Sequence, residues 1–274
     1  MSVSAKLKVS SIPPILLVGF GKMGGAMLAG WRERGLAPSI AVDPALPTSP
    51  GMDVTVVADA AAIPTDFAPA AVVLAVKPQN AAETLPLYAR YAGSAVMLSI
   101  MAGRTLAGMR GLLGAGAAVV RAMPNTPAAV RQGVTVACPG PGVSGAQRAL
   151  CDSLLAAIGV VAWVDDEALL DPVTAVSGSG PAYVFLLAEL MEQAAIAEGL
   201  PADLARLLAR QTVTGSGALL AASPDDAAVL RRNVTSPGGT TAAALAVLMD
   251  AAAWPDALAR AIAAATARSR ELAG

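Results

Sequence analysis

Apolar residues in the first half of the chain come in short unbroken runs, and most of these runs are followed by a stretch with helical spacing. Continuous rather than alternating runs are typical of strands buried on both faces, as in a parallel sheet covered by helices. The pattern predicts an α/β fold whose N-terminal part is a Rossmann-type doubly wound, mostly parallel sheet. We predict strands at 15–19, 40–42, 71–76, 96–100, 117–121, 133–137 and 160–164, and helices at 23–34, 79–91, 106–113 and 143–158.

Beyond Asp165 the strand pattern stops and only helical spacing continues. Pro181, Pro201 and Pro255 stand where helices are expected to begin, since proline is tolerated in the first helical turn. We therefore predict a dinucleotide-binding Rossmann domain over 1–165 and an all-helical, substrate-binding dimerisation domain over 166–274. The helices expected there are 167–174, 181–198, 202–220, 227–233, 239–251 and 255–272.

Composition narrows the classes of partner. Hydrophobic residues make up 55% of the 274 residues and charged residues 14%, with a formal net charge of −1. This balance argues against nucleic acid or an anionic membrane as a partner, and a surface poor in charge favours a homo-oligomer. No stretch of 18 uncharged apolar residues occurs, so no membrane span is predicted. Two cysteines, Cys138 and Cys151, have neither metal nor redox spacing, which favours a cytoplasmic location.

Two absences restrict the chemistry. The chain contains no histidine, which excludes every mechanism that needs an imidazole acid, base or metal ligand. The four lysines are Lys6, Lys8, Lys22 and Lys77, so no residue beyond 77 supplies an amine. No metal site is predicted.

A glycine-rich turn, Gly19-Phe20-Gly21-Lys22-Met23-Gly24, follows the first predicted strand and opens a helix. In that context the glycines allow a tight turn and close approach of a pyrophosphate, which predicts dinucleotide binding rather than a merely flexible turn. Asp43 follows the second strand, where a carboxylate accepts ribose hydroxyls and repels a 2′-phosphate. With no Lys or Arg between 35 and 76 it favours NADH, unless it is only a turn residue before Pro44.

Three later segments are also candidates, each with a plainer alternative. Lys77, at the end of the 71–76 strand, either approaches the cofactor or covers the strand end. Asn125 and Thr126 lie between two prolines and either face the nicotinamide or serve only the turn. Ser177, in the sequence Ser-Gly-Ser-Gly-Pro, either contacts a ligand or lies in a tight loop at the domain junction.

The segment Ser236-Pro237-Gly238-Gly239-Thr240-Thr241 directly precedes a helical run. Two glycines and three hydroxyls at a helix start direct backbone N–H groups, hydroxyl donors and the helix dipole toward one small volume. Such a volume suits a carboxylate or phosphate. The alternative is an ordinary N-cap with a flexible lead-in.

Taken together, these motifs resemble those of the pyrroline-5-carboxylate reductases, in the order in which that family has them, over nearly the whole chain from Ile15. The last two matching pieces are the most specific. The matching segments are 19–24, 75–78, 102–103, 121–127, 177–183 and 234–241.

The resemblance implies hydride transfer from NADPH or NADH to the C=N carbon of 1-pyrroline-5-carboxylate, giving L-proline in proline biosynthesis. It also implies a homodimer, with larger rings such as a decamer of dimers. Carried over by position, the substrate site is Ser236, Gly239, Thr240, Thr241 and Ser177, with Thr241 beside the ring nitrogen as the catalytic residue. The cofactor site is Gly19, Gly21, Met23, Gly24, Asp43, Ala75, Lys77, Pro78, Asn125 and Thr126.

The chain departs from the family at Asp43-Pro44, where many relatives carry Ser or Thr with a basic neighbour and favour NADPH. Pro172 is a second departure, expected to bend the helix that leads to Ser177.

Three other functions compete with this interpretation. Dehydrogenases of β-hydroxy acids rely on a lysine in the helical domain, which this chain lacks. Reduction of a six-membered cyclic imine stays open, and so does a dinucleotide-binding regulator without catalysis.

Overall fold

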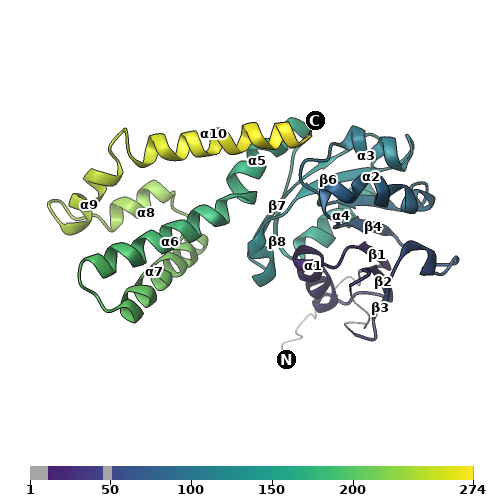
Figure 1. Ribbon diagram of the computed structural model, residues 1–274, viewed down its shortest axis with the longest axis horizontal. Coiled ribbons are helices and arrows are strands. Elements are labelled where there is room, and N and C mark those ends of the chain that lie inside the picture. The colour runs from purple at the N-terminus through teal and green to yellow at the C-terminus, as the bar shows by residue number, and fades with distance from the viewer. Residues whose placement is uncertain (1–11, 46–50, 274) are drawn as a thin grey trace, which may run out of the picture. The chain divides into compact units, whose positions relative to one another are not determined.

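The computed structural model describes residues 12–45 and 51–273, and the described part contains one sheet of eight strands in the order β3-β2-β1-β4-β5-β6-β7-β8. Strands β1 to β6 are parallel, and β7 runs antiparallel to β6. The order 3-2-1-4-5-6 is that of a doubly wound dinucleotide fold, so the predicted fold class is confirmed (Figure 1). The strands are β1 (Ile15–Val18), β2 (Ser39–Val42), β3 (Val54–Val57), β4 (Ala71–Leu74), β5 (Val96–Ser99), β6 (Val119–Met123), β7 (Gly133–Pro139) and β8 (Gly159–Trp163).

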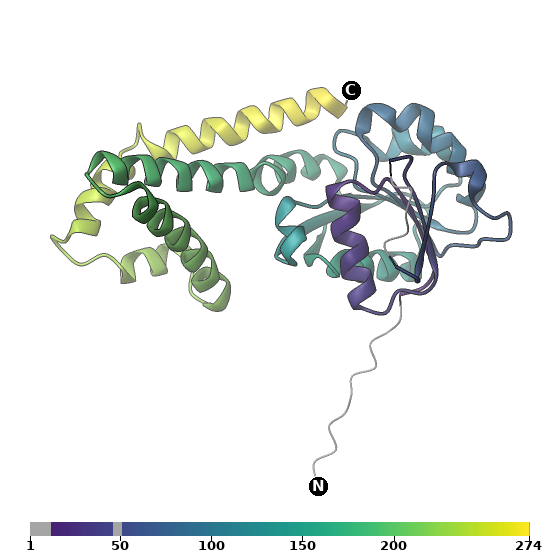
Figure 2. The same cartoon turned by 60° about the horizontal axis from the view of Figure 1, so that its bottom comes forward.

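Helices cover both faces of this sheet (Figure 2). Ile15 and Leu17 of β1 face one layer, where they join Met27 and Trp31 of a helix. Leu16 and Val18 face the opposite layer. This division explains the unbroken apolar runs, because successive side chains of a strand point to opposite faces and both faces are covered. The first layer contains α1 (Lys22–Glu33) and α4 (Gly145–Ala156), and the second contains α2 (Ala81–Thr84) and α3 (Leu106–Leu113).

Two features of this part differ from the sequence prediction. The stretch 79–91 is not one helix: it begins as 3-10 helix, becomes α2 and returns to 3-10 helix at Leu85–Tyr91. Pro86 explains the change, since proline lacks the N–H that an α-helix needs. Strand β3 was not predicted; Val54 alone of its four residues is buried, Thr55 is exposed, and Val56 and Val57 are partly buried.

The described residues up to 178 and from 266 onward form one compact unit, and residues 179–265 form a second. The last strand ends at Trp163, and the predicted boundary at residue 165 stays a prediction. The first unit includes α5 (Leu170–Val173) and a π-helical turn at Thr174–Gly178. The other helices are α6 (Gly180–Ala197), α7 (Ala202–Ala222), α8 (Ala227–Asn233), α9 (Thr240–Leu248) and α10 (Trp254–Ala273), whose last turns belong to the first unit.

The helices of the second unit leave many apolar side chains exposed, among them Phe185, Leu190 and Leu207. By length and composition, one stretch of the described chain, Glu167–Ala197, also qualifies as a candidate membrane helix, and only 6% of its most apolar window is buried in the structure. An unburied apolar surface on a bundle of helices calls for a covering partner.

Candidate functional site

The three glycines of the first turn have three different surroundings. Gly19 has φ +94°, and a Cβ there would lie 2.7 Å from the Ala75 carbonyl oxygen. A Cβ on Gly24 would lie 2.4 Å from the Gly19 carbonyl oxygen, so this glycine lets α1 begin close to the strand. At Gly21, by contrast, nothing lies within 4 Å of a Cβ position. The turn therefore leaves open space at the one glycine where a pyrophosphate approaches in such folds.

Asp43 is fixed against this turn. One of its carboxylate oxygens accepts a hydrogen bond from the Phe20 N–H at 2.8 Å, and the other accepts from the Ala45 N–H at 2.9 Å. The side chain thus stands at the carboxyl end of β2 with a defined orientation. A fixed negative charge at this point opposes a 2′-phosphate and accepts hydroxyl donors.

The ends of β4 and β5 carry the next candidates. Lys77, in the loop that follows β4, is exposed, and the carbonyl of Pro78 accepts a hydrogen bond from Arg104 Nε at 2.9 Å. This contact ties the loop that follows β5 to the loop that follows β4. Because β4, β5 and β6 are parallel, their loops emerge at the same edge of the sheet as the glycine turn.

Beyond β6, two predicted residues of different sites lie in contact. Asn125 is 9% exposed, and its side-chain amide donates to the Ser177 carbonyl at 3.1 Å. Its oxygen accepts from the Val134 N–H at 2.9 Å. Thr126, next along the chain, is exposed. The structure thus joins the predicted nicotinamide loop to the turn that carries Ser177.

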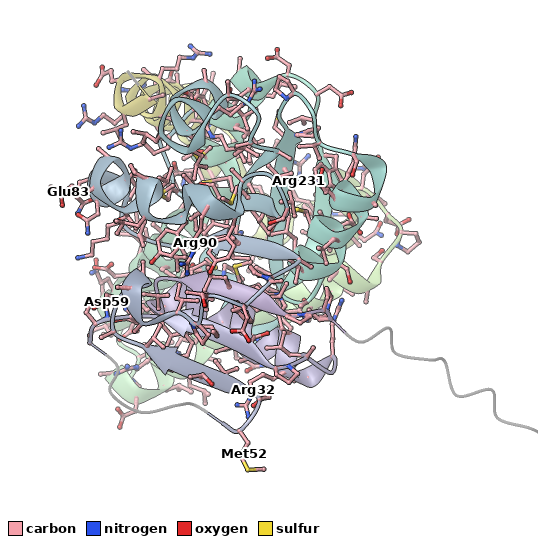
Figure 3. The ribbon with its side chains drawn as sticks, turned by 90° about the vertical axis from the view of Figure 1, so that its right-hand side faces the viewer. Arg32, Met52, Asp59, Glu83, Arg90 and Arg231 are labelled. Carbon is pink, nitrogen blue, oxygen red and sulfur yellow. The ribbon has the colours of Figure 1, made fainter. Side chains whose placement is uncertain are left out.

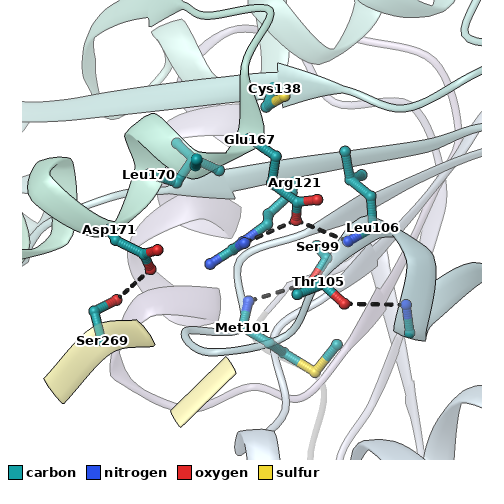
Figure 4. A network of polar contacts seen from close by, with 12 residues as sticks. Ser99, Met101, Thr105, Leu106, Arg121, Cys138, Glu167, Leu170, Asp171 and Ser269 are labelled. Carbon is teal, nitrogen blue, oxygen red and sulfur yellow. Dashed lines mark hydrogen bonds and ion pairs between the residues drawn. The ribbon is translucent and has the colours of Figure 1, made fainter. Parts of the chain in front are cut away.

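A partly buried ion pair was missed by sequence reasoning. Arg121 of β6 lies 2.7 Å from the Glu167 carboxylate, and the same carboxylate oxygen accepts from the Leu106 N–H at 2.8 Å (Figure 4). Glu167 therefore also places negative charge at the start of α3. A lone arginine within the apolar run of β6 was the available signal, since a buried charge requires a partner.

The ion pair influences one neighbouring thiol. Burial raises the pKa of Cys138, and the nearby Glu167 carboxylate raises it further. The Cys138 side chain has only weak contacts to carbonyl oxygens, those of Pro139 and Asp165. A thiol that resists ionisation in this way is a packing residue rather than a nucleophile.

The amino edge of the sheet carries a partly exposed surface ion pair. Arg32, near the end of α1, pairs with Asp53 at 2.8 Å, and Arg32 and Met52 both lie at the β3 end of the sheet (Figure 3). The arginine holds the pKa of Asp53 below its usual value. Because Asp53 precedes β3, this cation lies at the amino edge, away from the carboxyl end of β2. Within the described ranges no group of three or more His, Cys, Asp or Glu is arranged to bind a metal.

The segment from Ser236 to Thr241 lies in the second unit. It forms a turn in which the Gly239 N–H donates to the Ser236 carbonyl at 3.0 Å, with Gly238 at φ +69°. Gly239 is the N-cap of α9 and has no side chain with which to cap it. The first N–H to bond back along the helix is that of Ala243, so the N–H groups of the first turn have no helical acceptor.

The first unit thus contains eleven of the predicted site residues, and the second contains Ser236, Gly239, Thr240 and Thr241. Their roles toward ligands stay predictions. In the first unit the predicted residues are Gly19, Gly21, Met23, Gly24, Asp43, Ala75, Lys77, Pro78, Asn125, Thr126 and Ser177.

Comparison with known proteins gives one consistent family. Residues 167–272 match the family model described as pyrroline-5-carboxylate reductase dimerisation. The chain is 39% identical to a pyrroline-5-carboxylate reductase of Pseudomonas aeruginosa, over 96% of this chain and 98% of that one. A pyrroline-5-carboxylate reductase structure from Coxiella burnetii is 31% identical, with a TM-score of 0.86 over 95% and 98% of the two chains. A Plasmodium falciparum pyrroline carboxylate reductase solved with NADP bound is 27% identical, with a TM-score of 0.81 over 95% and 99%. This chain belongs to the pyrroline-5-carboxylate reductase family.

Proposed function

We propose that this protein reduces the C=N bond of 1-pyrroline-5-carboxylate to give L-proline, with NADPH or NADH as the hydride donor, in the cytoplasm. Besides its family, one observation carries the proposal: the glycine turn is crowded at Gly19 and Gly24 and open only at Gly21. A Cβ at residue 21 would occupy the space in which we place the pyrophosphate. The residues present therefore fit a dinucleotide.

When bound, the dinucleotide supplies the hydride to the C=N carbon. We place Gly19, Gly21, Met23 and Gly24 along its pyrophosphate and Ala75, Lys77 and Pro78 farther along it. Asn125 and Thr126 lie nearer the nicotinamide in this proposal. Hydroxyl and N–H donors of Ser236, Gly239 and Thr240 hold the substrate carboxylate, and Ser177 also contacts the substrate.

The absence of histidine agrees with this chemistry. A protonated cyclic imine is already a strong electrophile, so the protein needs to position it rather than polarise it. Thr241 stands beside the ring nitrogen, near which the proton is taken up. The carbon gains a hydride and the nitrogen retains a proton, which completes the secondary amine of proline.

An assay of NAD(P)H oxidation with 1-pyrroline-5-carboxylate tests the reaction directly. We expect turnover with this substrate and much less with the six-membered homologue. Thr241→Ala should lower turnover far more than it weakens NAD(P)H binding. The assignment of Thr241 is wrong if cofactor affinity collapses while turnover on bound cofactor persists.

Asp43 supports the use of NADH at least comparably with NADPH. Its carboxylate is held by two N–H donors, and Arg32 is paired with Asp53 at the amino edge of the sheet, away from Asp43. Measuring kcat/KM for both cofactors tests this, with Asp43→Ser expected to shift the ratio toward NADPH. A strong NADPH preference in the unaltered protein would contradict it.

Residues 167–272, which match the dimerisation model, and the exposed apolar helices support a homodimer. We propose that a second copy covers Phe185 and its apolar neighbours, so that no membrane is needed to cover them. Assembly of dimers into a larger ring, up to a decamer of dimers, is the finer form of this proposal. Sedimentation at several concentrations distinguishes these states.

A further inference from the structure

The π-helical turn Thr174–Gly178 lies where the chain leaves the first unit, and one of its carbonyls lacks a helical donor. In an α-helix the N–H of residue 181 would donate to the carbonyl of Ser177. Residue 181 is proline, which has no N–H and whose ring crowds the carbonyl four residues earlier. The π-helical donor, the Ala182 N–H, bonds to the Ser179 carbonyl at 2.9 Å instead. The Ser177 carbonyl must therefore find its donor elsewhere.

Asn125 provides that donor. Its amide nitrogen lies 3.1 Å from the Ser177 oxygen, and its amide oxygen lies 2.9 Å from the Val134 nitrogen. One partner is an acceptor and the other a donor, so only an amide in this one orientation satisfies both. Because Asn125 is 9% exposed, little water is available to replace either contact.

A second contact joins the same two segments. A Cβ on Gly178 would lie 2.8 Å from the terminal methyl of Met123, so the missing side chain at residue 178 makes room for methionine. Within the turn, the Ser177 hydroxyl donates to the Val173 carbonyl at 3.0 Å. The end of β6 thus supports the turn through Met123 and Asn125, on both sides of Pro124.

We propose that Asn125 is a positioning residue: by donating to the Ser177 carbonyl it fixes the π-helical turn and thereby the place of the Ser177 side chain in the reaction. This inference rests on the proposed function, in which Ser177 contacts the substrate. It assigns the side chain of Asn125 to Ser177 and not to the cofactor, although the loop lies near the nicotinamide.

The substitution Asn125→Asp separates the two contacts. A carboxylate still accepts from the Val134 N–H, but its other oxygen faces the Ser177 carbonyl, and two acceptors repel each other. Asn125→Ala removes both contacts without adding charge. Comparing the two variants tells whether the effect arises at Ser177 or at β7.

Three quantities are measured for each variant: kcat, KM for 1-pyrroline-5-carboxylate, and the NAD(P)H dissociation constant from fluorescence titration. We expect both variants to lose at least about tenfold in kcat/KM for the imino acid, because small displacements of positioning groups are costly in rate. The NAD(P)H dissociation constant should change by less than about twofold, because in this inference the Asn125 side chain does not contact the cofactor. A tenfold change would need a lost cofactor interaction worth about 1.4 kcal/mol. If Asn125 instead bound the cofactor, its variants would raise the NAD(P)H dissociation constant more than they lower kcat/KM for the imino acid, and that result would overturn the inference.

Pro181→Ala supplies a rescue test. It restores an N–H at residue 181 that can donate to the Ser177 carbonyl, so Asn125→Ala should cost less in the Pro181→Ala background than alone. Strictly additive losses in kcat/KM would overturn the inference. If Asn125 served only the stability of β7, the N–H introduced by Pro181→Ala would not reduce the loss of activity caused by Asn125→Ala.

Ser144→Ala is the matched control for general weakening of the first unit. Ser144 caps α4 by accepting from the Gln147 N–H, and α4 follows β7, whose end pairs with the start of β6 at the other edge of the sheet. This variant should keep its kcat and KM. If it lost activity as the Asn125 variants do, the loss would reflect stability and the inference would fail.

Failure of the proposed function looks different. In that case the unaltered protein would not oxidise NAD(P)H with 1-pyrroline-5-carboxylate at all. The placement of the turn would then still be tested by thermal unfolding, in which Asn125→Ala and Pro181→Ala should be coupled. Additive changes in melting temperature would overturn the role of Asn125 independently of activity.

Discussion

In the first unit Trp31, Leu16 and Leu98 have no exposed surface, whereas Phe185 and Leu207 in the second unit are 66% and 62% exposed. Of residues 179–265, all of which the structure describes, Ala205 and Ala209 alone are buried. The first unit completes its core by covering both faces of a sheet. In the second unit α6 and α7 pack on each other, but most apolar side chains of its helices stay exposed, so these apolar faces depend on another copy of the chain.

The sharpest way to break this comparison is to place a charge on the exposed helices. Phe185→Glu would force a carboxylate into the proposed dimer interface, at a cost of several kcal/mol. We expect dissociation to monomers and the loss of nearly all activity, seen by sedimentation and by the reductase assay. Met52→Glu is the control, because Met52 projects from the β3 edge of the first unit (Figure 3). A dimeric, active Phe185→Glu protein would contradict the dependence of the second unit on a partner.

Within the first unit, Gly24 and Gly21 separate packing from ligand binding. Gly24→Ala places a methyl 2.4 Å from the Gly19 carbonyl oxygen and should lower the free energy of unfolding by about 1–3 kcal/mol. Gly21→Ala meets nothing within 4 Å and should leave the stability unchanged while weakening NAD(P)H binding. Denaturant unfolding and cofactor titration on both variants measure the split. Equal behaviour of the two variants would show that the turn is not built around a ligand.

Two ion pairs, the partly buried Arg121–Glu167 and the exposed Arg260–Asp256, test how burial changes the contribution of a charge pair to stability. Arg121→Met leaves a partly buried carboxylate without its cation and should cost about 1–3 kcal/mol of stability. Arg260→Met, in the second unit, removes half of an exposed pair with Asp256 and should change stability by less than about 1 kcal/mol. Denaturant unfolding of both variants provides the test. The comparison fails if the two losses are alike.

The sequence predicted seven of the eight strands, all but β3, and the glycine turn, because their signals are local. An unbroken apolar run such as Val96–Ser99 and a glycine turn after β1 each identify themselves within a few residues. The pairs Arg121–Glu167 and Asn125–Ser177 were out of reach because they join residues 46 and 52 positions apart. Their partners are decided by the sheet order and by the π-helical turn. Proline explains part of what was missed, since Pro86 breaks the expected helix and Pro181 leaves a carbonyl without a donor.

The smallest expected effect is on the pH dependence of stability and comes from a buried thiol. Both cysteines lie in the first unit. Burial raises the pKa of Cys151 to about 12, from 9.0 for an ordinary thiol. The folded thiol therefore stays protonated while the unfolded chain ionises. The protonated Cys151 thiol contributes fully to the free energy of unfolding below about pH 9, and this contribution is lost as the pH rises from about 9 toward 12. By linkage this amounts to about 1 kcal/mol at pH 10.

Cys151→Ala should remove that part of the alkaline loss. We expect the fall in unfolding free energy between pH 8 and pH 10 to be smaller in the variant by about 1 kcal/mol. Tyr88, whose pKa burial also raises to about 12, is present in both proteins and cancels in the comparison. Denaturant unfolding at the two pH values measures the difference. Because the second unit has no cysteine, thiol labelling in the same titration reports the opening of the first unit alone. An identical pH dependence in both proteins would mean that Cys151 is not shielded from water in the folded state.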